Sequence, residues 1–178
     1  MSALQILPHY NFEDWQLWEG KWEIIHGIPY AMSPAPVPKH QIIANALGAE
    51  FHFELKKCKD CKAMQPVDYK VGDDTVVQPD LLIVCEPIAK PYLDFAPVLI
   101  AEILSPSTAL KDTHTKYQIY EQQKIKYYLI ISPDKEEVEV FENSDKGFQR
   151  INAGSSFTHQ FIFSEECVVD IDFKEIWK

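Results

Sequence analysis

Two acidic residues interrupt stretches of the sequence that are otherwise apolar. Asp80 lies within the segment VVQPDLLIVC, and Glu102 lies within VLIAEIL. A carboxylate inside an apolar strand is costly unless it is paired or bound to a metal ion. Pro79 cannot donate to a strand ladder, so the first strand must bend or lie at a sheet edge there. Two such acids on consecutive strands predict one shared site, and their hard oxygen atoms suit Mg²⁺.

Three more polar residues follow Glu102 at helical spacing. Asp112, Lys116 and Tyr120 are four residues apart, within a helix that we expect from about 109 to 124. This spacing leaves two interpretations open. The residues form a plain Asp–Lys surface pair, or the lysine points back over the strand ends toward the two acids.

The predicted order of elements decides whether these residues can meet. After a lead-in over residues 1–20, in which we expect Trp15 and Trp18 to cover part of the core, two short strands turn near His26-Gly27. A Pro-rich turn over 33–38 ends the second strand, and an amphipathic helix of about five turns follows over 40–57. Strands are then expected over 62–72, 75–85, 96–104, 125–132, 136–143 and 148–154, with a tail on the sheet surface. This order predicts an α/β fold with a mixed sheet packed by helices.

The overall size predicts a single domain spanning residues 1–178, with its core at about 21–143. The sequence has no apolar run of about 18 residues, and its N-terminus lacks the pattern of a secretory signal. We therefore expect a cytoplasmic protein without a membrane span. Cys58 and Cys61 form a lone C-x-x-C pair without the second pair that a zinc site needs, so reduced thiols are the prediction for all four cysteines.

The net charge of −10 argues against broad, nonspecific adhesion to nucleic acid. Residues 134–178 are the most acidic part, with eleven acidic and five basic side chains. Arg150 is the only arginine, so lysines would have to carry any contact with DNA. A lysine cluster at the end of the first helix fits either DNA contact or ordinary solvation. Its members are Lys56, Lys57, Lys59 and Lys62.

Several runs of the sequence resemble one family. PDLLIVC, VLIAEILSPST, KDxxxKxxxY and YYLIISP are similar to the Uma-type restriction endonuclease family, part of the PD-(D/E)XK nuclease superfamily. WEIIHG, MSPAP and His40-Gln41 match its N-terminal signature, so the resemblance covers roughly residues 21 to 143. It implies a restriction-endonuclease-like fold, in which helices flank a mixed central sheet and a β-hairpin extends the N-terminus.

The resemblance also implies roles for the residues singled out above. Asp80 corresponds to the metal-bridging aspartate, and Glu102 to the second metal carboxylate, with the backbone carbonyl of Ile103 completing the set. The superfamily usually has a lysine two residues after the second acid, where this chain has Leu104. In the family that this chain resembles, the catalytic lysine looks as if it has moved to the following helix. Lys116 stands at that position. Four further residues match family positions with less certain roles: Glu23, His40, Asp112 and Tyr120.

The expected function is therefore hydrolysis of DNA phosphodiester bonds by a Mg²⁺-dependent endonuclease, with Mn²⁺ as a substitute. A homodimer is expected, because nucleases that act on duplex DNA often pair their sites. The alternative is a catalytically silent nuclease fold that acts as a binding or structural homodimer, which the acidic charge favours. The chain departs from the family at Lys124, where Gly is usual, and at Leu129 and Ser132, where the family commonly has Trp-x-x-Asp.

Overall fold

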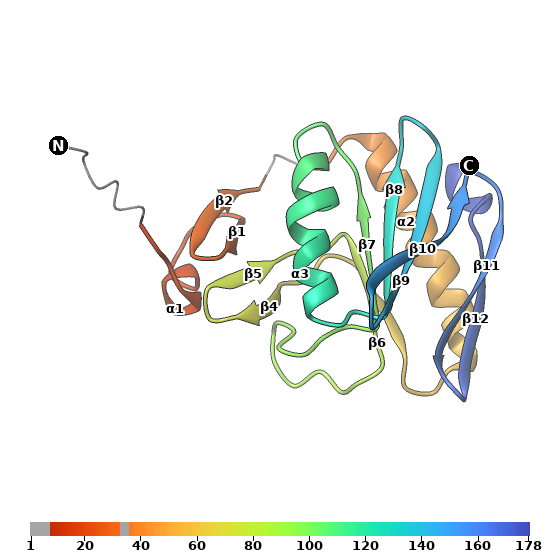
Figure 1. The fold of residues 1–178 in the computed structure, drawn as a ribbon, viewed down its shortest axis with the longest axis horizontal. Coiled ribbons are helices and arrows are strands. Elements are labelled where there is room, and N and C mark those ends of the chain that lie inside the picture. Colours follow the sequence, from red (N-terminus) through yellow and green to blue (C-terminus); the bar gives the residue numbers. More distant parts are fainter. Residues whose placement is uncertain (1–7, 33–35) are drawn as a thin grey trace.

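A six-stranded mixed sheet forms the centre of the molecule, which is described by a computed structural model over residues 8–32 and 36–178 (Figure 1). Its strand order is β10-β9-β8-β7-β6-β3. The strands are β3 (Lys62–Met64), β6 (Leu81–Val84), β7 (Leu99–Ile103), β8 (Tyr127–Ser132), β9 (Glu137–Ser144) and β10 (Gly147–Gly154). Strands β7 and β8 run parallel and the other pairs of this sheet are antiparallel. All five residues of β7 are buried, as expected for a central strand covered on both faces.

Helices cover both faces of this sheet (Figure 1). On one face lies α2 (Pro38–Glu54), which continues into the 3₁₀ turn η1 (Leu55–Lys57). On the other face lies the helix between β7 and β8, which consists of the π-helical segment η2 (Lys111–Lys116) and α3 (Tyr117–Gln122). Side chains that alternate along β6, β7 and β8 therefore enter two separate apolar cores.

A smaller four-stranded sheet stands beside the central one, in the order β2-β1-β5-β4. Its strands are β1 (Trp22–Ile25), β2 (Ile28–Ala31), β4 (Tyr69–Gly72) and β5 (Thr75–Val77). The predicted hairpin is confirmed, and its turn residues His26 and Gly27 have φ values of 50° and 75°. Two left-handed residues are what a tight type I′ turn requires. The short helix α1 (Phe12–Trp15) precedes this sheet, and Trp15 and Trp18 are half-buried against it.

Two predicted strands were wrong in extent. The segment 75–85 forms β5 and β6, which belong to different sheets, and the break falls at Gln78, Pro79 and Asp80. Proline has no N–H for a ladder, so the chain leaves one sheet here and enters the other. The segment 62–72 likewise divides into β3 and β4 around Pro66. The Pro-rich turn and the MSPAP motif lie partly outside the described residues, because 33–35 are not among them.

The helix expected over 109–124 is confirmed from Ala109 to Gln122; Ala109 and Leu110 are α-helical, and the π-helical segment follows at Lys111. The end of this helix explains why glycine is usual at position 124 in the family that the sequence resembles. Lys124 has a φ of 58°, the left-handed conformation that glycine adopts without strain. Ile125 N–H donates to the Tyr120 carbonyl and Lys124 N–H to the Glu121 carbonyl, which is the Schellman pattern of a helix end.

The C-terminal region contains a hairpin that the sequence patterns did not predict, because the tail was expected only to lie on the sheet surface. Strands β11 (Thr158–Ser164) and β12 (Cys167–Asp172) pair with each other as a separate two-stranded sheet, followed by the 3₁₀ turn η3 (Glu175–Trp177). The hairpin packs beside α2 and helps to close one apolar core (Figure 1).

The prediction of reduced cysteines was wrong. Cys58 is bonded to Cys167 and Cys61 to Cys85, so none of the four is free. The pairs join residues 109 and 24 positions apart, a closeness that only the folded chain creates. None of the described helices is long and apolar enough to cross a membrane.

Candidate functional site

Asp80 directly precedes β6, and Glu102 lies in the neighbouring strand β7. The β6–β7 ladder pairs Leu81 with Ala101, so the next pair in the same register is Asp80 with Glu102. Opposed residues of an antiparallel pair point to the same face, with Cβ atoms about 5 Å apart. The two acids that the strand patterns singled out therefore share one place, at the point where the chain passes between the two sheets.

Glu102 is the centre of a buried network of polar side chains. Its Oε1 accepts hydrogen bonds from Lys116 Nζ at 2.9 Å and from the Tyr120 hydroxyl at 2.8 Å. All three residues are buried. Lys116 and Tyr120 come from η2 and α3, which the β7–β8 crossover lays over the face that carries Glu102. The interpretation in which the lysine points back to the acids is therefore the one that the structure adopts.

Glu23 joins this network from the small sheet. Its Oε1 lies 2.8 Å from Lys116 Nζ and accepts the backbone N–H of Gln78 at 2.9 Å, while its Oε2 contacts Lys111 Nζ. Lys111 and Lys116 are five residues apart. A π-turn closes between residues i and i+5, so it brings these two lysines to one face of the helix. The π-helix thus allows both lysines to hold one carboxylate.

Asp80 lies at the same strand ends and has partners of its own. Its Oδ2 accepts the backbone N–H of Ile103 at 2.8 Å and lies 3.3 Å from His40 Nε2. The pKa of His40 is raised, first by its hydrogen bond to Asp80, which outweighs burial, and further by the charge of Asp80 and the Ile103 carbonyl. His40 lies in the first turn of α2, so helices from both faces of the sheet reach the same strand ends.

The site holds more negative than positive charge. Its acids are Asp80, Glu102, Glu23 and Asp112, and the cations that contact them are Lys111, Lys116 and, when protonated, His40. If all four acids are ionised, four acids against two lysines leave an excess of two negative charges, or one when His40 is charged. Burial raises the pKa of Glu102 well above its usual value, and the nearby acids raise it further despite Lys116.

The remaining pKa shifts follow from the same balance. Burial would lower the pKa of Lys116, but Glu102, Glu23 and Asp112 outweigh it and raise the pKa, so the ammonium stays charged. Burial would raise the pKa of Glu23, but Lys116 and Lys111 outweigh it and lower the pKa. Burial raises the pKa of Asp112, which lies 3.6 Å from Lys116.

Two buried polar atoms in this region lack a hydrogen-bond partner, Asp112 Oδ1 and His40 Nδ1. An orphaned buried carboxylate oxygen is unusual, and it marks a place where a further donor or cation fits. Over residues 8–32 and 36–178, however, no three His, Cys, Asp or Glu side chains stand together as a ready ligand set. The acids are tied to lysine, tyrosine and histidine instead.

The structure thus brings together all the side chains that the sequence singled out. Asp80, Glu102 and Lys116 meet, and Glu23, His40, Asp112 and Tyr120 surround them. Ile103 contributes its N–H to Asp80, and its carbonyl leaves the strand on the same side. The sequence analysis missed Lys111 and the N–H of Gln78. The lysine cluster at the end of α2 lies about 25 Å from His40, the length of a 17-residue helix.

Comparisons with known proteins agree with this picture. The family described as Uma2, putative restriction endonuclease, matches residues 10–166. An uncharacterized protein from Synechocystis sp. is 26% identical over 149 residues, which cover 79% of this chain and 77% of that protein. The fold is similar to a crystal structure titled as a putative nuclease belonging to DUF820 from Anabaena variabilis. That match has a TM-score of 0.74 at 16% identity and covers 94% of this chain and 97% of that one, which confirms the predicted fold class.

Proposed function

Because this chain belongs to the Uma2 family of putative restriction endonucleases, we propose that it hydrolyses DNA phosphodiester bonds with the help of Mg²⁺. In this proposal Asp80 and Glu102 hold the metal and Lys116 acts on the scissile phosphate. The observation that carries it is the buried contact between Lys116 Nζ and Glu102 Oε1, at 2.9 Å, beside Asp80. A nuclease of this type needs two carboxylates that hold the metal and a lysine ammonium group beside them.

The residues at the site fit a hard divalent cation. Asp80, Glu102 and the Ile103 carbonyl offer oxygen atoms, which Mg²⁺ prefers, and Mn²⁺ accepts the same donors. The excess of negative charge favours an added cation, as does Asp112 Oδ1, which has no hydrogen-bond partner and lies 3.6 Å from Lys116 Nζ. When bound, Mg²⁺ lowers the pKa of a coordinated water and polarises the phosphate. His40 contacts Asp80 Oδ2 in the metal-free chain, and we propose that the ring moves away from the carboxylate when the metal binds.

Lys116 serves in this proposal as a cation and not as a base. Its raised pKa keeps the ammonium protonated. It can therefore donate hydrogen bonds to the attacking water or to the charge that develops on the phosphate oxygens. Glu23 and Tyr120 are positioning residues, because Glu23 fixes Lys116 and Tyr120 fixes Glu102. Such support keeps the reacting groups in place in a buried site.

The substrate is proposed to be duplex DNA, cut by two copies of the chain so that both strands are reached. The charge of −10 and the single arginine limit the number of phosphate contacts, so binding should be weak without the metal. The lysine cluster beyond α2 is too distant to contact the phosphate at the site. We propose instead that the bound cation and Lys116 supply most of the positive charge at the cleaved bond.

The test is cleavage of supercoiled plasmid in Mg²⁺ or Mn²⁺, with EDTA as the blank. The wild type should nick or linearise the plasmid, while Asp80→Asn, Glu102→Gln and Lys116→Met should each be inactive. Lys146→Met is the matched control, because Lys146 is exposed in the β9–β10 turn. Cleavage that the three site variants retain would mean a contaminating nuclease. If the wild type neither cleaves DNA nor binds Mn²⁺ in a calorimeter, the silent homodimer becomes the better account.

A further inference from the structure

The C-x-x-C pair takes no part in the proposed nuclease site, yet the fold gathers all four cysteines around it. We propose that the four cysteines form a thiol–disulfide exchange site whose substrate is a dithiol reductant. Reduction at Cys61–Cys85 would transfer the remaining disulfide from Cys58–Cys167 to Cys58–Cys61. The C-terminal hairpin would then lose its covalent tether. This inference does not depend on the nuclease proposal.

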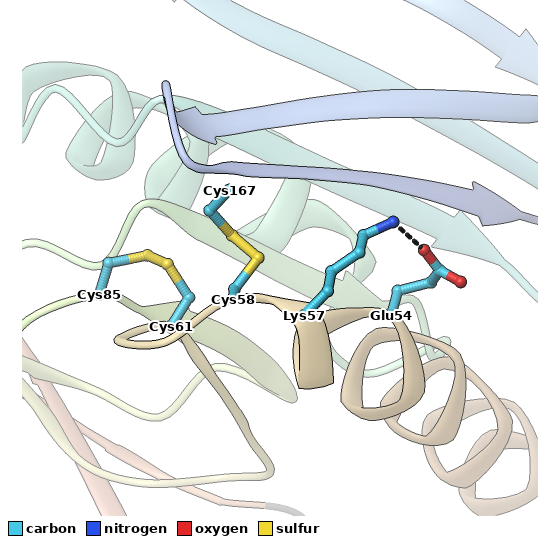
Figure 2. The surroundings of a disulfide bond; sticks show 6 residues. All are labelled: Glu54, Lys57, Cys58, Cys61, Cys85 and Cys167. Carbon is cyan, nitrogen blue, oxygen red and sulfur yellow. Dashed lines mark hydrogen bonds and ion pairs between the residues drawn. A yellow bond between two sulfur atoms is a disulfide. The ribbon is translucent and has the colours of Figure 1, made fainter.

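The two disulfides lie next to each other. Cys58 caps the end of η1, Cys61 directly precedes β3, and two residues separate them. Figure 2 shows Cys61–Cys85 and Cys58–Cys167 side by side, with Lys57 and Glu54 on the adjoining turn. A thiol released at Cys61 therefore remains close to the Cys58 sulfur. This proximity gives an intramolecular reaction a high effective concentration.

Exposure selects the disulfide that a reductant reaches first. Cys85 is half-buried, whereas Cys58, Cys61 and Cys167 are each less than 8% exposed. Cys61–Cys85 is also a link across the edge of the central sheet, because β3 pairs Lys62 with Val84 in the same register. Attack from solvent is thus expected at the Cys85 sulfur.

Charge favours the same direction of attack. In the sequence, Lys59 and Lys62 stand next to Cys58 and Cys61 and outnumber the one acid there, Asp60, and Lys57 is paired with Glu54. Glu86 follows Cys85, and Glu166 precedes Cys167. Nearby positive charge stabilises a thiolate, and a stabilised thiolate is the better leaving group. An external thiolate that attacks Cys85 therefore expels Cys61 rather than the reverse.

The exchange balances with one dithiol. One thiolate of the reductant bonds to Cys85 Sγ and the Cys61 thiolate leaves; the second thiol of the reductant then displaces Cys85, which takes up a proton. The reductant is oxidised to its disulfide. Cys61 thiolate next attacks Cys58 Sγ, forms the Cys58–Cys61 bond and expels Cys167, which also takes up a proton. The chain gains two electrons and two protons and keeps one disulfide.

The consequence falls on the C-terminal hairpin. Strands β11 and β12 hydrogen-bond only to each other as a sheet, and they are attached to the rest of the described chain chiefly by apolar packing and by Cys58–Cys167. The exchange replaces a link across 109 positions with one that closes a two-residue loop. The hairpin then depends on packing and on the hydrogen bonds of Ile162 with Lys126 and Tyr127, so we expect it to open more often and to become sensitive to protease.

The experiment adds one molar equivalent of dithiothreitol to the oxidised full-length chain without oxygen, blocks thiols with iodoacetamide and maps disulfide peptides without reduction. The expected product carries a Cys58–Cys61 link, with Cys85 and Cys167 alkylated. If the reduced molecules carry four alkylated cysteines and no Cys58–Cys61 link is detected, the proposal is wrong. Zinc held by four thiolates in the freshly isolated chain would overturn it as well.

Two matched variants isolate the transfer step. Cys85→Ser leaves Cys61 free from the start and should form Cys58–Cys61 without any reductant. Cys61→Ser lacks the attacking thiol and should keep Cys58–Cys167 after one equivalent of dithiol. If Cys85→Ser keeps Cys58–Cys167 and a free Cys61, the exchange does not occur. Limited proteolysis should cut between β11 and β12 faster in the exchanged wild type than in treated Cys61→Ser.

Discussion

Lys116 Nζ lies between two carboxylates from different sheets, 2.9 Å from Glu102 Oε1 and 2.8 Å from Glu23 Oε1. Glu102 comes from the central sheet, and Glu23 comes from the small sheet that the N-terminal hairpin joins. One ammonium group therefore joins the two sheets at the place where the candidate metal ligands meet. The same ammonium group should therefore contribute both to stability and to the proposed activity.

Replacing Lys116 with Met should destabilise the protein by about 3–5 kcal/mol, because the change leaves buried carboxylates without their cation. Urea unfolding of the wild type and the variant measures the difference. Lys146→Met, on the surface, should stay within about 0.5 kcal/mol of the wild type. A loss at Lys116 as small as that of the control would contradict the burial and charge described here.

Replacing Glu102 with Gln should change how stability depends on pH in the absence of metal. The pKa of Glu102 is raised above 4.5 in the folded state, so the folded chain holds this proton more tightly than the unfolded one. Stability contributed by the protonated acid is therefore lost as pH rises from about 4.5 through the raised folded pKa.

Glu102→Gln cannot lose that proton, so its stability should fall less steeply over the same range. Urea unfolding in EDTA at a series of pH values measures both slopes. Glu86→Gln, at an exposed position, should keep the wild-type slope. Equal slopes for Glu102→Gln and the wild type would show that Glu102 is not held in its protonated form by the fold.

Replacing Lys124 with Gly should stabilise the protein by about 0.5–1 kcal/mol. Lys124 has a φ of 58° at the end of α3, and this left-handed conformation strains every residue with a side chain. The greater freedom of glycine in the unfolded chain offsets part of the gain. Thermal unfolding provides the measurement, and Lys126→Gly, inside the segment that leads to β8, should destabilise instead. A decrease in stability for Lys124→Gly would argue against the helix end as described.

Full reduction of both disulfides should lower the free energy of unfolding by about 2–5 kcal/mol, since the links close long loops in the unfolded chain. Urea unfolding with and without excess reductant measures this loss. A chain in which all four cysteines are replaced by Ser should show no response to the reductant. If the wild type is equally insensitive, the cysteines are not paired in solution.

The sequence predicted on physical grounds that Asp80 and Glu102 share one site, because a carboxylate in an apolar strand needs a partner. It could not predict Lys116 in the same way, since helical spacing allowed a surface pair equally well, and only the family resemblance favoured the site. Lys111 lies in the KDxxxKxxxY run, but its contact with Glu23 could not be predicted, because it depends on a π-turn that no residue pattern marks.

The break at Pro79 and the cysteine pairs could not be predicted in full either, because both depend on contacts between distant parts of the chain. Pro79 predicted a bend, but whether the chain stays in one sheet or passes to another depends on packing far from that residue. Cys58 and Cys167 are brought together by the C-terminal hairpin, neither strand of which the patterns predicted. Lys124 is the opposite case: the departure from the family glycine already marked a position where the turn is strained.

A crystal soaked with Mn²⁺ tests the central claim most directly, through the anomalous signal of the ion. The proposal predicts a peak bonded to Asp80, Glu102 and the Ile103 carbonyl, with His40 displaced from Asp80 and Lys116 still at Glu102. The contrary result is a structure without that peak, in which Asp80 keeps its contacts with Ile103 N–H and His40 at saturating metal.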